Sequence, residues 1–172
     1  PDSSVCILEK ESKCGLHASG RNSGVLHAGF YYTADSFKAR FTRKGNQRLT
    51  EYCDAKNIKL NKCGKLVVAQ NESELPWLDE LMNRASKNSV PLESVTEEEG
   101  RAIEPRVKIY QKALFSPTTS SVNPKELVES LLSDAIREGV QIKSNSRYLG
   151  RAGKRSIQTS DGAYEAKYLI NV

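Results

Sequence analysis

The sequence predicts an α/β protein in which one portion is inserted into another. Short apolar runs of strand length alternate with segments of helical periodicity along most of the 172 residues, a pattern typical of α/β sheets. The two ends of the chain have the features of one sheet, while the central stretch carries its own mixed set of elements. We therefore expect residues 1–40 and 122–172 to form one portion and residues 41–121 to form the other.

The first half of the chain begins with a strand and a loop. Residues 4–9 form a continuous apolar run that ends in Glu9, which suits a parallel strand covered on both faces. A glycine-rich loop follows over residues 13–29, where so many permissive residues suggest close backbone packing. Residues 36–57 have helical periodicity, and Ser36 is placed to cap the helix.

The predicted helix at residues 36–57 carries the densest positive charge of the chain, around Phe37 and Phe41. We interpret this charge as the solvated outer face of an amphipathic helix. The alternative is attraction of an anionic substrate or of an acidic membrane surface. No nucleic-acid-binding motif accompanies the charge, so a nucleic-acid partner is not predicted.

The remaining elements follow in a regular order. Strands are predicted at residues 64–69, 112–115 and 140–142, and helices at residues 72–88, 96–104 and 124–139. Thr96 and Glu99 stand in capping-box relation, and Pro124 suits the first turn of a helix. Residues 156–172 are predicted to form a hairpin around an Asp161-Gly162 turn.

The composition is that of a soluble globular protein. The net charge is +5, 27% of the residues are charged, and the mean hydropathy is -0.55. No apolar run approaches the ~20 residues that a membrane span requires, and we find no signal peptide. The four cysteines form no C-x-x-C pair and no metal site is predicted, so we expect buried, reduced thiols.

An acid at the end of the first strand is typical of dinucleotide-binding folds. There the carboxylate binds the adenosine ribose, about 20 residues after a Gly-rich fingerprint. Only eight residues precede Glu9, so the fingerprint does not fit. We therefore expect the chain to be an internal piece that lacks its phosphate loop.

The loop after Glu9 carries the most specific signal. Residues 19–32 read S-G-R-N-S-G-V-L-H-A-G-F-Y-Y. This string resembles the S-G-x-N-S-G-V-x-H-A-G-x-Y-Y segment of L-2-hydroxyglutarate dehydrogenases, which are D-amino-acid-oxidase-like (DAO) FAD-dependent oxidoreductases. Similarity continues through residues 36–40 and 63–69. The resemblance implies an incomplete FAD-binding, Rossmann-like sheet with an inserted α+β substrate-binding portion. We therefore expect this chain alone to bind FAD weakly or not at all and to be inactive.

The resemblance also implies roles for individual residues. Glu9 would bind the adenosine ribose, and the residues expected along the pyrophosphate and flavin are Ser19, Arg21, Asn22, Ser23, Gly24 and Val25. His27 is the candidate base for the hydroxyl proton of the substrate, because histidine titrates closest to working pH. The alternatives are that His27 only hydrogen-bonds the loop or the flavin, or attaches the flavin covalently. His17 is expected to be an exposed loop residue.

The implied reaction is oxidation of L-2-hydroxyglutarate, or a similar 2-hydroxy acid, to the 2-oxo acid. Candidates for binding the substrate carboxylates are Tyr31, Tyr32 and Lys65, with Arg40 as a further cation. The implied electron acceptor is a quinone or oxygen. The expected location is the cytoplasm, and peripheral attachment to a quinone-containing membrane is left open as an alternative. Two alternatives stay open: a related oxidase of amino acids, sarcosine or glycerol phosphate, and a non-catalytic α/β binding module.

Overall fold

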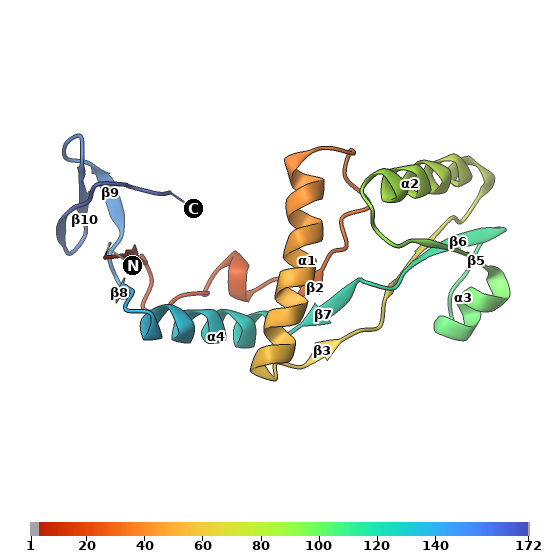
Figure 1. Cartoon of the computed structure of the whole chain (residues 1–172), viewed down its shortest axis with the longest axis horizontal. Helices are drawn as coiled ribbons and strands as arrows, with labels where there is room; N and C mark the ends of the chain where they lie inside the picture. Colours follow the sequence, from red (N-terminus) through yellow and green to blue (C-terminus); the bar gives the residue numbers. More distant parts are fainter. Residues whose placement is uncertain (1–3, 172) are drawn as a thin grey trace. The chain divides into compact units, whose positions relative to one another are not determined.

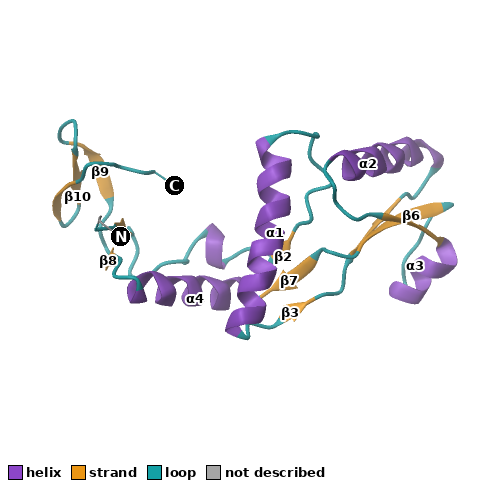
Figure 2. Cartoon of the chain, in the orientation of Figure 1, coloured by secondary structure: helices purple, strands orange, loops and turns teal. Residues whose placement is uncertain are grey.

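The computed structural model describes residues 4–171. The described chain divides into two compact units, one of residues 4–22 and 124–171 and one of residues 23–123. Both units contain helices and strands. Figure 1 colours them by position in the sequence, and Figure 2 colours them by secondary structure. Parallel and antiparallel strand pairs are both present, which confirms the predicted α/β class.

The first unit contains a parallel strand pair. β1 (Cys6–Leu8) pairs with β8 (Gln141–Lys143), and α4 (Pro124–Arg137) precedes β8. This confirms the expected parallel strand and the helix-to-strand return. The expectation that both faces of the strand are covered is wrong within residues 4–171, because Val5 and Ile7 are 51% and 41% exposed.

The glycines of the loop after β1 allow backbone to pack against backbone. A Cβ on Gly20, in the short helix η1 (Ala18–Gly20), would overlap the Gly15 carbonyl oxygen. A Cβ on Gly15 would lie 2.9 Å from the Val128 side chain of α4. The close packing predicted for this loop therefore includes backbone contact within the loop and contact with α4.

A three-stranded antiparallel sheet completes the first unit. It consists of β9 (Tyr148–Arg151), β10 (Ser156–Thr159) and β11 (Gly162–Glu165), and the predicted Asp161-Gly162 turn joins the last two. The predicted strand does not continue to the end of the chain: it stops at Glu165, and Ile170 is 84% exposed. The Ala166 N–H still donates to the Arg155 carbonyl at 2.9 Å, but residues 166–171 form no strand in the described chain. Val172 lies outside the described residues.

Two small antiparallel sheets form the strands of the second unit. One has the order β2 (Val25–Leu26), β7 (Ser120–Val122), β3 (Leu60–Asn61). The other has the order β4 (Lys65–Val68), β6 (Lys112–Ser116), β5 (Glu93–Thr96).

The helices of the second unit begin where the capping residues predict. α1 (Phe37–Lys56) starts after Ser36, whose hydroxyl accepts a hydrogen bond from the Ala39 N–H at 3.1 Å. α3 (Glu97–Ile103) starts with the predicted capping box of Thr96. Between them, η2 (Glu72–Glu74) leads into α2 (Leu75–Lys87). The predicted helices are thus confirmed to within a few residues.

The core of the second unit explains the division of the chain. Phe30 is 1% exposed and packs with Leu78 and Leu81 of α2 and with Leu114 of β6. Residues 23–40 therefore belong to the same compact unit as residues 41–121, whereas we expected them with the chain ends. The apolar side chain of Phe30 decides this, because burying it requires α2.

The buried side of α1 is not the one marked by its aromatic residues. Phe37 and Phe41 are 72% and 60% exposed and stack on each other, while the small residues Ala39 and Cys53 face the interior. All four cysteines are free, but Cys6 and Cys63 are exposed, so the expectation of buried thiols is wrong for those two. No helix within residues 4–171 has the length and apolarity to cross a membrane.

Candidate functional site

An extended segment places three predicted site residues on one face. From residue 23 to residue 28 the burial alternates. Ser23 and His27 are exposed and Val25 is half-buried, while residues 24, 26 and 28 are buried. This is the period of two that an extended chain imposes. Ser23, Val25 and His27 therefore point to the same side, away from the core.

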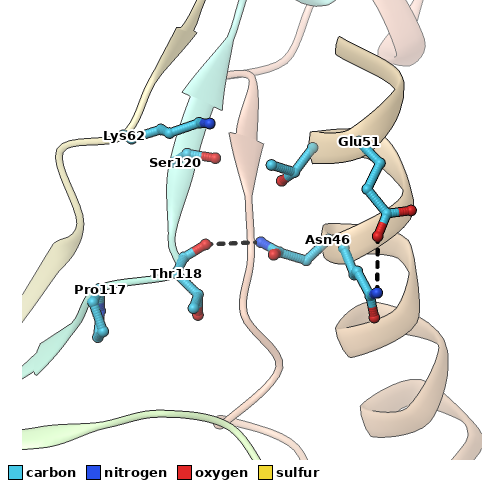
Figure 3. Close-up of a pocket in the computed structure, with 8 residues that line it drawn as sticks. Asn46, Glu51, Lys62, Pro117, Thr118 and Ser120 are labelled. Atoms are coloured by element: carbon cyan, nitrogen blue, oxygen red, sulfur yellow. Dashed lines mark hydrogen bonds between the residues drawn. The ribbon is translucent and has the colours of Figure 1, made fainter. Parts of the chain in front are cut away.

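Hydrogen bonds fix the strand that leads to His27. The Val122 N–H donates to the Gly24 carbonyl at 2.9 Å. The Asn46 side chain of α1 donates to the carbonyls of Leu26 and Thr118, each at 3.0 Å, and the second of these bonds is drawn in Figure 3. Sequence reasoning missed Asn46, because a polar residue within a helix gives no sign of whether its amide meets solvent or another segment.

His27 has a free imidazole. No hydrogen bond joins it to any residue in the described part of the chain. Partial burial lowers its pKa below the ordinary value of 6.5, and the nearby positive charge of Lys65 lowers it further. A neutral imidazole with an uncommitted nitrogen is suited to accept a proton.

Lys65 and Tyr31 lie in contact next to this histidine. The Lys65 Nζ is 4.6 Å from the centre of the Tyr31 ring. Lys65 follows Gly64, whose φ of +70° is unfavourable for other residues. A side chain at this position would place its Cβ within the Phe115 ring. Three residues predicted separately, His27, Tyr31 and Lys65, are thus brought together by the second unit.

Tyr32 and Arg40 contact other partners. The Lys38 Nζ lies 4.5 Å from the centre of the Tyr32 ring, so the two neighbouring tyrosines meet different cations. The Arg40 guanidinium lies over the exposed rings of Phe37 and Phe41. The contacts in the structure do not bring Tyr32 or Arg40 to the His27 cluster.

The first unit contains Glu9 at the end of its parallel strand. Its N–H donates to the Lys143 carbonyl at 2.9 Å, so the β1–β8 pairing continues to this residue. One carboxylate oxygen accepts the Glu11 N–H at 2.9 Å. The other oxygen has no hydrogen bond within residues 4–171 and is available to a ribose hydroxyl.

The polar loop after Glu9 contains both free and committed groups. The Asn22 side-chain amide donates to the carbonyls of Ala18 and Ser19, both at 2.9 Å, and so closes the turn of η1. Ser19 and Arg21 are exposed, and their side-chain donors have no partner in the described residues. Asn22 thus shapes the loop, while Ser19 and Arg21 can donate to an anion such as a diphosphate.

Two pockets in the second unit are lined by residues that we did not predict as site residues. One, of about 360 Å³, lies between α1 and the chain around β7 and β3, and Figure 3 labels six of its residues: Asn46, Glu51, Lys62, Pro117, Thr118 and Ser120. The other, of about 390 Å³, shares Asn46 and Thr118 and includes Arg43 and Lys44. No predicted site residue lines either pocket.

The model of the FAD dependent oxidoreductase family, DAO, matches residues 2–172 of this chain. The chain belongs to the DAO family. An L-2-hydroxyglutarate dehydrogenase of Escherichia coli is 34% identical over 99% of this DAO chain, and the mitochondrial L-2-hydroxyglutarate dehydrogenase of Nematostella vectensis is 41% identical over 72% of it. The chain spans 41% and 27% of these two relatives.

Solved structures confirm the DAO fold. The glycine oxidase of Geobacillus kaustophilus matches 95% of this chain with a TM-score of 0.82 at 20% identity, and the chain covers 47% of it. The FAD-bound L-alpha-glycerophosphate oxidase of Mycoplasma pneumoniae matches 90% with a TM-score of 0.78 at 23% identity, and the chain covers 42% of it. The chain is therefore a partial Rossmann-like α/β fold of this family.

Proposed function

We propose that the protein containing this chain oxidises the C2 hydroxyl of L-2-hydroxyglutarate, or of a closely similar 2-hydroxy acid, with FAD as cofactor. The observation that carries this proposal is identity with L-2-hydroxyglutarate dehydrogenases along nearly the whole chain: 34% over 99% of it for the Escherichia coli relative and 34% over 87% for the human one. The geometry around His27 supports the same chemistry.

The residues of both units fit the parts of FAD. In the first unit, Glu9 has a free carboxylate oxygen for ribose, and Ser19 and Arg21 have free donors for the diphosphate. In the second unit, Ser23 and Val25 lie on the face that points away from the core, and Gly24, whose φ of +69° favours glycine, has no side chain. A flat ring needs such an approach of backbone without Cβ obstruction. When bound, FAD accepts the hydride from C2 of the substrate.

His27 is the proposed base. Loss of hydride from C2 leaves the hydroxyl proton to be removed, and the free imidazole of His27 is neutral above its lowered pKa. Lys65 and the Tyr31 hydroxyl are the proposed contacts for a substrate carboxylate, since a cation and a hydroxyl both donate to carboxylate oxygens. Tyr32 remains a weaker candidate, because its ring is engaged with Lys38.

The test is a substrate panel on the product of the complete reading frame that encodes residues 1–172. With FAD and a dye acceptor, we expect turnover of L-2-hydroxyglutarate and little turnover of the D enantiomer, glycine, sarcosine or glycerol phosphate. A preference for an amine would contradict the proposal, and absence of any turnover and of bound flavin would favour a non-catalytic module.

The same assay decides the electron acceptor. Replacing the dye by a quinone analogue or by oxygen shows which of the two takes the electrons. If a quinone is the acceptor, we expect a cytoplasmic protein that is attached peripherally to a quinone-containing membrane. Cell fractionation tests that location.

A further inference from the structure

The end of α2 holds the backbone of the segment that contains Tyr31. The Arg84 guanidinium donates to the Tyr31 carbonyl at 2.9 Å. The Asn88 side-chain amide donates to the Tyr32 carbonyl at 2.9 Å and to the Gly29 carbonyl at 3.4 Å. Arg84 of α2 and Asn88, the residue that caps the end of α2, thus satisfy three carbonyls of a four-residue segment that lies more than fifty positions earlier in the chain.

Both donors are themselves held in place. The Nε of Arg84 donates to the Glu80 carboxylate at 2.7 Å, and the guanidinium lies 4.9 Å from the centre of the Trp77 ring. A guanidinium bound along one edge and stacked on one face presents its remaining N–H groups in a fixed direction. Asn88 is only 9% exposed, so its amide has little freedom to turn toward water.

The core fixes the other side of the same segment. Phe30 is 1% exposed and packs against Leu78 and Leu81 of α2. With Phe30 buried and the Tyr31 carbonyl held by Arg84, the direction of the Tyr31 side chain is determined. Its ring lies against the ammonium group of Lys65, at 4.6 Å from Nζ to the ring centre.

We propose that Arg84 and Asn88 are positioning residues of the candidate site, which fix Tyr31, and through it Lys65, to receive a carboxylate of the substrate. This proposal rests on the proposed oxidation of a 2-hydroxy acid for the identity of the ligand. Arg84 and Asn88 act on the site indirectly. Arg84 binds the Tyr31 carbonyl, the Tyr31 ring contacts the Lys65 ammonium group, and the charge of Lys65 lowers the pKa of His27.

A purely structural role of Arg84 and Asn88 predicts a different result. In that case a substitution lowers the stability of the fold but leaves His27 and Lys65 in the same relation within the molecules that remain folded. A measurement on the folded state of the site therefore separates the two roles, and thermal unfolding alone does not.

The two histidines of the chain provide that measurement. Nuclear magnetic resonance titration follows His27 and His17 separately, with His17 as an internal reference in the first unit. In Arg84→Met we expect the His27 pKa to rise toward its ordinary value, because Lys65 is no longer held by a fixed ring. Arg84→Lys keeps the charge but not the planar fork, so we expect an intermediate rise.

Lys87→Met is the matched control, since it removes a cation from an exposed position of the same helix. It should leave both histidines unchanged. Asn88→Ala tests the second donor and should shift His27 in the same direction as Arg84→Met. Unchanged His27 titration in the folded Arg84→Met and Arg84→Lys chains would overturn the proposal, whatever happens to their melting temperatures.

A kinetic experiment tests the consequence for substrate binding. In the product of the complete reading frame, Arg84→Met should raise KM for L-2-hydroxyglutarate about tenfold relative to Lys87→Met, with kcat changed by less than about twofold. A fall in kcat with unchanged KM would contradict a carboxylate-positioning role. If the unsubstituted protein does not oxidise this substrate, the proposed function fails, and the His27 titration still decides the role of Arg84.

Discussion

Single residues connect the structure to the proposed chemistry most directly, and His27 is the central one. Its imidazole is free within the described chain, and burial together with Lys65 lowers its pKa below 6.5. At neutral pH the ring is therefore uncharged without any further change in the site.

This state of His27 predicts a pH profile for the oxidation. A base must be deprotonated to act, so kcat/KM should rise with pH, level off above the His27 pKa, and have its midpoint below 6.5. His27→Gln should lower kcat by roughly 10²–10⁴-fold and abolish this limb of the profile. A midpoint that persists in His27→Gln would assign the titration to another group.

Gly64 illustrates a second constraint at the residue scale. It has a φ of +70°, and a Cβ at this position would overlap the Phe115 ring. Gly64→Ala should therefore lower the free energy of unfolding by roughly 1–3 kcal/mol. Urea unfolding measures this, with Gly150→Ala as control, because a Cβ on Gly150 meets nothing within 4 Å.

Among the structural elements, the hairpin of β10 and β11 is stabilised by one carboxylate. Asp161 accepts hydrogen bonds from the hydroxyls of Thr159 at 2.5 Å and of Ser146 and Tyr164 at 2.8 Å. These donors, Thr159 first, hold the pKa of Asp161 at about 2, below the ordinary 3.8. The ionised carboxylate thus joins the turn before β9 to both strands of the hairpin.

The lowered pKa of Asp161 sets the pH range in which this contribution disappears. Because the pKa is lower in the folded chain than in the unfolded one, the stabilisation is present above 3.8 and is lost as the pH falls toward about 2. The melting temperature of Asp161→Asn should lie below that of the unsubstituted chain at neutral pH, and the difference should shrink across that range. Glu165→Gln, an exposed change on β11, serves as control; a constant difference at all pH values would contradict this account.

At the scale of the whole molecule, this chain corresponds to less than half of a DAO protein of known sequence. It covers 41% of the length of its Escherichia coli relative. Its sequence contains the acid and the polar loop expected along FAD, but no G-x-G-x-x-G fingerprint. The diphosphate of FAD normally lies on the backbone N–H groups of that fingerprint.

We therefore expect the 172-residue chain to retain FAD poorly. After incubation with excess FAD and gel filtration, the flavin absorbance should correspond to well under one cofactor per chain. The product of the complete reading frame, treated in the same way, is the comparison. Stoichiometric flavin on residues 1–172 would show that the groups present here are sufficient for binding.

The sequence by itself determined the elements whose causes are local. Ser36, Thr96 and Pro124 mark helix starts through contacts within one turn, and the Asp161-Gly162 pair marks a hairpin turn through its backbone conformation. The string of residues 19–32 predicted the family, and the match of the family model to residues 2–172 confirmed it.

Only the tertiary structure decided the features that depend on distant residues. β2, β3 and β7 are two or three residues long, too short for a periodic pattern, and they exist because they pair with one another. The alternate faces of the segment around His27, and the different cations that contact Tyr31 and Tyr32, have the same origin. Hydrogen bonds and burial between segments far apart in the chain leave no local signal, so Arg84 and Asn88 become recognisable as parts of the site only once the chain is folded.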